Sequence, residues 1–89
     1  LKKMDFYEIL WKKSAIHELR NIDPQHIPKI VITVDALVEN PFPKGYRKLK
    51  NSKQSYRIRV GEYRVIYQVD NKEKIVTIFH IRHRKDAYQ

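Results

Sequence analysis

The sequence has no cysteine, and its 89 residues include only two glycines. The absence of cysteine excludes a disulfide framework and thiolate chemistry, and the two glycines do not form a Gly-rich phosphate loop. No apolar run is long enough to span a bilayer, and the first residues show no signal-peptide pattern. We therefore expect one cytoplasmic domain over residues 1–89 that has no membrane partner.

Acidic residues are also scarce. The chain has 10 Asp and Glu against 19 Lys and Arg, which gives a formal net charge of +9. Such a charge indicates the kind of partner rather than the fold: nucleic acid, an anionic membrane or an acidic protein. The charge is concentrated, since residues 44–64 hold eight basic side chains and one acid. This clustering favours a specific anionic surface over general solubility.

The first half of the chain predicts a strand and two helices. Residues 5–10 are short and rich in strand formers, and residues 14–22 have a helical apolar stripe that ends before Asp23-Pro24. Pro24 suits the first position of a second helix with Asp23 as its N-cap. Apolar residues then recur at helical spacing until Asn40-Pro41 ends the helix.

Residues 56–69 predict a β-hairpin. Apolar and polar side chains alternate on both sides of a Gly-Glu pair at positions 61–62, which suits a two-residue turn. This loop places Arg59 directly opposite Arg64, and like charges in such a pair cost up to about 1 kcal/mol. A local conflict of this kind often marks a functional site, and a bound anion would relieve it.

A last strand is predicted over residues 75–82, after a five-residue turn over 70–74. The pairs that follow are Val69 with Ile75, Arg64 with His80, and Ile66 with Ile78. The sheet residues expected to face the helices are Ile58, Val60, Tyr63, Val65, Tyr67, Ile75, Thr77, Phe79 and Ile81. A slip of one residue in the turn would reverse the faces of this strand. The whole order predicts an α+β domain: an N-terminal strand, a two-helix hairpin and a three-stranded antiparallel meander, with the helices packed on one face.

The opposite face would carry Arg57, Arg59, Arg64, His80 and Arg82. Arginine forks match phosphate oxygens, and single-stranded RNA is read by stacking on aromatic or guanidinium planes. Cleavage by the 2′-hydroxyl needs phosphate charge stabilisation, a base and an acid. Arginine is a poor base, so proton transfer falls to His80, His83, Tyr88 or the substrate itself.

Each of these residues also has a plainer interpretation. Arginines on the solvent face of a strand commonly serve solvation and edge protection, His80 is also consistent with a packed or exposed histidine, and Tyr88 with a lightly packed residue near the end of the chain. His80 and His83 with Asp86 do not make a set of three or four metal ligands. We expect no metal and no cofactor.

Three segments carry a family resemblance: ENPFPKGYRKLKNS, YRIRVGEYRVIYQVD and VTIFHIRHRKDAY. With them the chain resembles the RelE/ParE superfamily of toxins from type II toxin–antitoxin systems, on the RelE side. The resemblance implies a RelE-like fold and a metal-independent ribonuclease. Such a toxin cuts mRNA in the ribosomal A site by 2′-hydroxyl attack and thereby inhibits translation.

The resemblance also implies site residues. The catalytic positions fall on Arg57, Arg59, Arg64, Arg82 and Tyr88, and RNA-binding roles are expected of Lys48, Lys50, Lys53, His80 and Arg84. Arginines stand at the first two positions, where lysines are found in the best-known pattern, so a lysine base is in doubt. His83 is a replacement candidate, because histidine exchanges protons near neutral pH.

The implied partners are the ribosome with its mRNA and a small cognate antitoxin, RelB-like or similar, whose C-terminal segment wraps the toxin. Operator DNA would be contacted only through the antitoxin. A ParE-like inhibitor that binds DNA gyrase and cuts nothing is the main alternative, and a remnant that only binds its antitoxin is another. The clustered arginines favour cleavage, because gyrase inhibition does not need a phosphate clamp.

Overall fold

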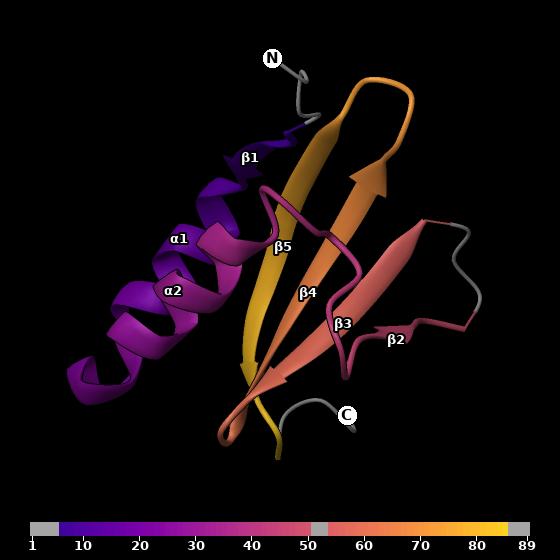
Figure 1. The fold of residues 1–89 in the computed structure, drawn as a ribbon. Helices are drawn as coiled ribbons and strands as arrows, with labels where there is room; N and C mark the ends of the chain where they lie inside the picture. The colour runs from indigo at the N-terminus through magenta and orange to yellow at the C-terminus, as the bar shows by residue number, and fades with distance from the viewer. Residues whose placement is uncertain (1–5, 51–53, 86–89) are drawn as a thin grey trace.

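Two helices pack on one face of a five-stranded sheet in the computed structural model, which describes residues 6–50 and 54–85 (Figure 1). The elements, in chain order, are β1 (Glu8–Trp11), α1 (Lys13–Arg20), the 3-10 helix η1 (Pro24–His26), α2 (Ile27–Ala36), β2 (Arg47–Lys48), β3 (Ser55–Val60), β4 (Tyr63–Asp70) and β5 (Ile75–His83). The strand order is β1-β5-β4-β3-β2. The predicted α+β class is confirmed. In the described part of the chain no helix is long and apolar enough to cross a membrane.

The N-terminal strand lies at one edge of the sheet. It covers Glu8–Trp11 rather than the predicted residues 5–10, and Asp5 lies outside the described residues. β1 runs parallel to β5, from Glu8 beside Ile75 to Trp11 beside Ile78. The predicted meander is therefore extended on both sides, because β2 adds a short antiparallel strand to the other edge.

The second helix begins later than predicted, although its predicted cap is present. Asp23 Oδ1 accepts a hydrogen bond from the backbone N–H of Gln25 at 3.2 Å, which is the N-cap interaction. The residues that follow form the 3-10 helix η1, and α2 begins at Ile27. Pro28 explains the delay, since it has no N–H to donate to the carbonyl of Pro24.

The hairpin register is confirmed, but the predicted register of β5 is wrong, by one residue from Ile75 to Ile78 and by two residues from His80 onward. Asp70 Oδ1 accepts hydrogen bonds from the N–H groups of Lys72 and Glu73, at 3.0 and 2.9 Å, and thereby shortens the turn. Asp70 consequently pairs with Ile75 at the end of the ladder. The observed pairs are Val69 with Val76, Ile66 with His80, and Arg64 with Arg82.

A β-bulge at Phe79, halfway along β5, shifts by one residue which side chains face the helices and which face the open side. Tyr67 pairs with Ile78 while Ile66 pairs with His80, so Phe79 has no partner of its own. Before the bulge, Val76 and Ile78 are buried, whereas the predicted core residues Ile75, Thr77 and Phe79 are only partly buried. After the bulge, Ile81 is buried as predicted. His80 and Arg82 are thereby returned to the face of Arg64.

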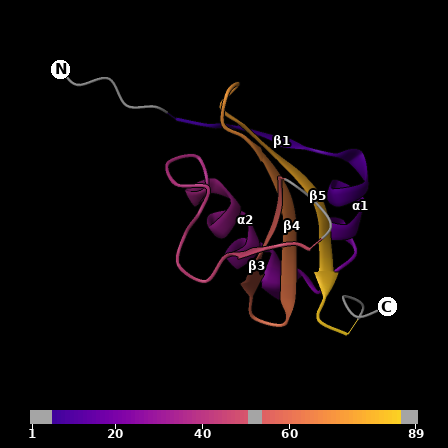
Figure 2. The ribbon, with the colours of Figure 1, turned by 90° about the vertical axis from the view of Figure 1, so that its right-hand side faces the viewer.

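The core lies between the sheet and the helices. α1 packs against β5 and α2 contacts β3, and Figure 2 shows α1 alongside β5. The helices contribute the buried Ala15, Ile30 and Val34. The largest fully buried side chain is Tyr67, whose hydroxyl donates to the Pro41 carbonyl at 2.8 Å. This bond ties the segment after α2 to the centre of the sheet.

We expect Tyr67→Phe to lower the free energy of unfolding by about 1–2 kcal/mol at pH 7, because the buried Pro41 carbonyl loses its donor. Burial raises the pKa of the Tyr67 hydroxyl above its ordinary value. The folded state therefore keeps a proton that the unfolded chain releases above about pH 10. The contribution of the Tyr67 hydroxyl to the free energy of unfolding is therefore constant below about pH 10 and decreases above it. Urea unfolding of the wild type and Tyr67→Phe from pH 7 to pH 11 measures both effects.

The stability difference between the two proteins should accordingly narrow above about pH 10. Tyr46→Phe is the matched control, because that ring is 37% exposed and its substitution should change stability by less than about 0.5 kcal/mol. A difference between wild type and Tyr67→Phe that stays constant over the whole pH range would contradict this account.

Candidate functional site

A cavity of about 360 Å³ opens on the face of the sheet that the helices leave free. Its lining residues are Gly45, Arg47, Arg57, Arg59 and Arg64. Arg47 pairs with Arg57 between β2 and β3, and Arg59 pairs with Arg64 between β3 and β4. The cavity therefore joins two opposed arginine pairs, of which the sequence predicted only the second.

The register extends the second pair into a row across three strands. Arg59 of β3, Arg64 of β4 and Arg82 of β5 lie side by side in the ladder, and we call these three residues the arginine row. Neighbouring strands are about 4.8 Å apart, so the arginine row spans roughly 10 Å. Arg64, at its centre, is only 4% exposed, whereas Arg59 is exposed. A central buried arginine between two others favours an anion above it.

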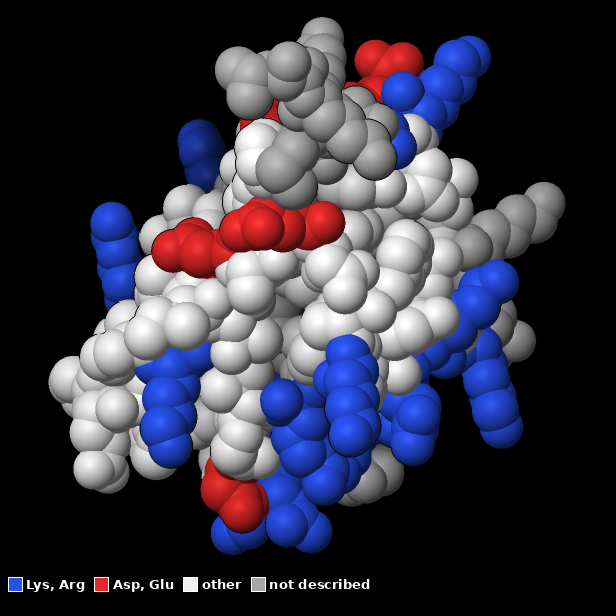
Figure 3. Space-filling model, in the orientation of Figure 1, with Lys and Arg blue, Asp and Glu red and all other residues white. Residues whose placement is uncertain are grey.

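Basic side chains are concentrated at the end of the molecule that holds the turn between β3 and β4. In Figure 3 the Lys and Arg side chains gather at the lower end of the view, where Figure 1 places the turn between β3 and β4. Most of the acidic groups visible in Figure 3 lie well above them. An RNA or acidic peptide approaching this end would meet a predominantly positive field.

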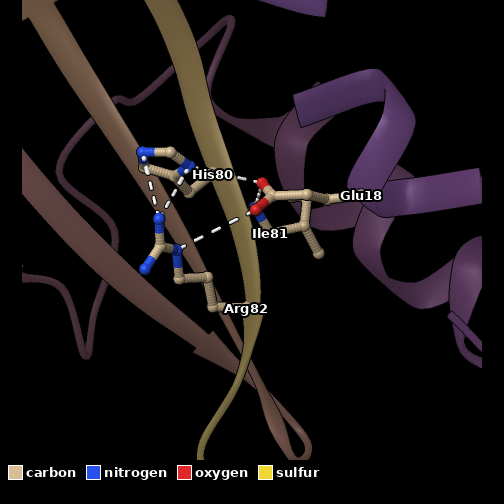
Figure 4. A network of polar contacts seen from close by, with 4 residues as sticks. All are labelled: Glu18, His80, Ile81 and Arg82. Carbon is tan, nitrogen blue, oxygen red and sulfur yellow. Dashed lines mark hydrogen bonds and ion pairs between the residues drawn. The ribbon is translucent and has the colours of Figure 1, made fainter. Parts of the chain in front are cut away.

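Arg82 and His80 share the open face but are also held from the side by Glu18 of α1 (Figure 4). Glu18 Oε1 lies 3.3 Å from His80 Nδ1, and Oε2 lies 3.9 Å from Arg82 Nε. Arg82 Nη2 lies 3.3 Å from Nδ1 and 3.5 Å from Nε2 of His80, against the imidazole. Sequence reasoning missed Glu18. The one signal in the sequence was that Glu18 is the single acidic residue of α1.

The structure does not bring His83 to the open face. His83 pairs with Tyr63, whose side chain belongs to the core face, and the two rings meet edge to face with centroids 5.3 Å apart. Its Nδ1 accepts a hydrogen bond from the Lys85 N–H at 3.2 Å. His83 lines a different cavity of about 500 Å³ between β5 and the end of α1. Arg82 is the one member of the arginine row in that lining.

The remaining predicted residues do not all share the face of the arginine row, because Lys48 pairs with Tyr56, whose side chain packs against the core. Lys48 in β2 and Lys50 just after it are exposed. Arg84 is exposed and forms an ion pair with Glu62 at 3.5 Å. Lys53 and Tyr88 lie outside the described residues. Over residues 6–50 and 54–85, no three His, Cys, Asp or Glu side chains are grouped as a metal site would require.

Fold and charge together define a small basic α+β protein of a known family. The family model described as the ParE toxin of type II toxin–antitoxin systems matches residues 9–88, and the chain belongs to this RelE/ParE family. Among curated relatives, a RelE1 toxin of Methanocaldococcus jannaschii is 32% identical over 86% of this chain and 89% of its own length. The superfamily that the sequence motifs indicated is thus confirmed.

Solved structures of RelE proteins have the same fold. The archaeal RelE–RelB complex from Pyrococcus horikoshii contains a chain with a TM-score of 0.79 and 28% identity, covering 89% of this chain and 96% of that one. The isolated RelE toxin of Escherichia coli gives a TM-score of 0.75 with 19% identity, covering 92% of this chain and 95% of that one. At that identity the second likeness concerns the fold alone.

We expect inorganic phosphate to stabilise the protein through the arginine row. Phosphate at ten times its dissociation constant adds about 1.4 kcal/mol, which corresponds to a rise in melting temperature of about 6–11 °C for a domain of this size. Arg59→Gln should reduce this rise by at least half. Without phosphate the variant should be at least as stable as the wild type, because it removes a like-charge pair. Thermal unfolding with and without phosphate provides both values.

Lys72→Gln is the matched control for the loss of one charge, since Lys72 is exposed in the turn between β4 and β5. It should respond to phosphate as the wild type does. Equal responses in all three proteins would show that phosphate acts without the arginine row.

Proposed function

We propose that this toxin is a ribosome-dependent mRNA endonuclease that inhibits translation without a metal ion. The observation that carries the proposal is the arginine row, which continues into the cavity lined by Arg47 and Arg57. Guanidinium groups arranged in this way suit a phosphate that gains negative charge during reaction. The activity would take place in the cytoplasm, where mRNA is translated.

The proposed reaction is an attack of the RNA 2′-oxygen on the adjacent phosphorus. A bond from O2′ to phosphorus forms as the bond from phosphorus to O5′ breaks, which leaves a 2′,3′-cyclic phosphate and a 5′-hydroxyl. The 2′-hydroxyl gives its proton to a base, and the leaving oxygen receives one from an acid. The arginine row would neutralise the charge on the non-bridging oxygens.

Proton transfer on the open face would involve His80, with Tyr88 as a further proposed participant. His80 occupies the same face as Arg82 and contacts its guanidinium. The position of His83 on the core side of β5 argues against a direct role. Lys50, Lys53 and Arg84 would then hold the RNA backbone beside the cut, and Lys48 would reach it around the β2 edge of the sheet.

The proposed partners are the ribosomal A site with its mRNA and a cognate RelB-like antitoxin. Similar solved structures are RelE–RelB complexes, including the archaeal one at 28% identity. A basic face of this kind attracts acidic residues of a partner segment, so the antitoxin would cover the arginine row and block RNA. Contact with operator DNA would be made by the antitoxin.

Gyrase inhibition is the second candidate, because the matching family model is described by the ParE name. That activity requires binding to a protein and no phosphate clamp. The arginine row therefore supports the nuclease over the gyrase inhibitor, and both activities can be measured with the same purified protein.

We expect Arg59→Ala to slow cleavage of a translated mRNA by about a hundredfold, the usual effect of removing one preorganised donor to a developing charge. Arg59 is exposed, so the variant should remain folded. Primer extension on mRNA bound to translating ribosomes measures the rate and position of the cuts. The wild type should cut in phase with codons and leave a 5′-hydroxyl.

Lys72→Ala, which removes a charge far along the sheet from the arginine row, should cleave at the wild-type rate. A gyrase supercoiling assay with the wild type is run in parallel. Intact mRNA together with inhibited gyrase would overturn the nuclease proposal in favour of the ParE-like activity.

A further inference from the structure

Glu18 occupies the edge of β5 where β1 has ended. The parallel pairing of β1 with β5 stops at Trp11 and Ile78, and Lys12 N–H then donates to the Ile78 carbonyl at 3.0 Å. Beyond that point Glu18 Oε1 accepts the hydrogen bond of the Ile81 backbone N–H at 3.0 Å. The carboxylate thus satisfies an edge donor that a strand would otherwise bind.

The same carboxylate reaches around the edge to two side chains of the open face. Figure 4 shows His80 and Arg82 converging on Glu18, with one guanidinium nitrogen of Arg82 pointing away from it. These contacts are semi-buried: the side chains of Glu18, His80 and Arg82 are 30%, 35% and 37% exposed. Partial burial weakens solvent screening and strengthens such contacts over those on an open surface.

The contact with Glu18 favours one tautomer of the His80 ring. A carboxylate oxygen can only accept, so the contact of 3.3 Å with Glu18 Oε1 requires a proton on His80 Nδ1. In the neutral ring Nε2 is then the acceptor. Arg82 Nη2 lies 3.5 Å from Nε2 and 3.3 Å from Nδ1, and the protonated Nδ1 cannot accept from it. Glu18 therefore leaves on His80 the lone pair that a general base uses.

The contact with Arg82 is incomplete. Arg82 Nε is buried and has no hydrogen-bond partner among the described residues, although Glu18 Oε2 lies 3.9 Å away. A movement of less than about 1 Å would turn this ion pair into a hydrogen bond, and catalytic contacts commonly tighten in this way once substrate is bound. A buried donor without a hydrogen-bond partner costs free energy, so a hydrogen bond from Arg82 Nε to Glu18 would stabilise this arrangement.

We propose that Glu18 is a positioning residue, which orients Arg82 and His80 for the reaction through its negative charge. This inference rests on the proposed nuclease function. Glu18 fixes the guanidinium from the Nε side, so that its outer nitrogens face the phosphate, and it fixes the proton of His80 on Nδ1. The carboxylate also weakens ground-state attraction of RNA, because it offsets part of the positive charge of Arg82.

The test is Glu18→Gln, because the glutamine carbonyl can still accept from Ile81 N–H, while the negative charge and the second acceptor oxygen, which faces Arg82 Nε, are lost. We expect kcat for cleavage of ribosome-bound mRNA to fall about tenfold, which corresponds to about 1.4 kcal/mol in activation free energy. The affinity for RNA should stay the same or rise up to about threefold. A residue that only caps the edge of β5 would alter neither kcat nor affinity in this variant.

Glu39→Gln is the matched control, since Glu39 is exposed beyond the end of α2, and it should keep wild-type kcat and RNA affinity. Unchanged kcat in Glu18→Gln would overturn the positioning role. Faster cleavage in Glu18→Gln would also overturn it, because Glu18 would then restrain Arg82 from its productive position.

A readout independent of activity separates this inference from the proposed function. Nitrogen-15 NMR of the His80 ring should report the Nδ1–H tautomer in the wild type and a mixture of tautomers in Glu18→Ala, which removes the oxygen that contacts Nδ1. If the wild type does not cleave mRNA but the variant shows the tautomer change, the proposed nuclease function is wrong and the role of Glu18 in orienting His80 still holds. Identical His80 spectra in both proteins would refute that role, whatever the activity.

Discussion

Repulsion between like charges is the constraint around which the open face is organised. The arginine row places three guanidinium-bearing residues at equivalent points of β3, β4 and β5, with the central one almost buried. The sheet fixes their backbones about 4.8 Å apart, so the side chains have little freedom to separate. Chain topology therefore maintains a concentration of charge that the arginines alone would not form, and this gives the surface its affinity for anions.

The parts of this site that could be predicted from sequence are those fixed by local turn chemistry. A Gly-Glu turn sets the register of β3 against β4, so the opposition of Arg59 and Arg64 followed directly. The face of β5 could not be predicted in the same way. Its phase depends on the cap that Asp70 places on the turn and on the bulge at Phe79. Neither has a clear signal in the alternation of apolar residues.

Glu18 illustrates a second limit on prediction. A lone acid on an amphipathic helix normally belongs to its solvated side, and 63 residues separate it from the Ile81 N–H that it binds. Only the end of β1 at Trp11 exposes the edge of β5 at that point. The partner of Arg82 is thus determined by the length of a strand at the other end of the chain, which no pattern near Arg82 encodes.

The short turn and the bulge in β5 form a pair of offsetting displacements. Relative to a five-residue turn, the observed turn moves Ile75 to Ile78 by one step, and the extra residue at Phe79 moves everything after it by one more. Two such steps return His80, Ile81 and Arg82 to their original sides of the sheet. Either irregularity without the other would exchange Ile81 with a charged neighbour in the core. Insertions and deletions in this part of the chain can therefore be accepted during evolution only in compensating pairs, even though the turn itself is exposed.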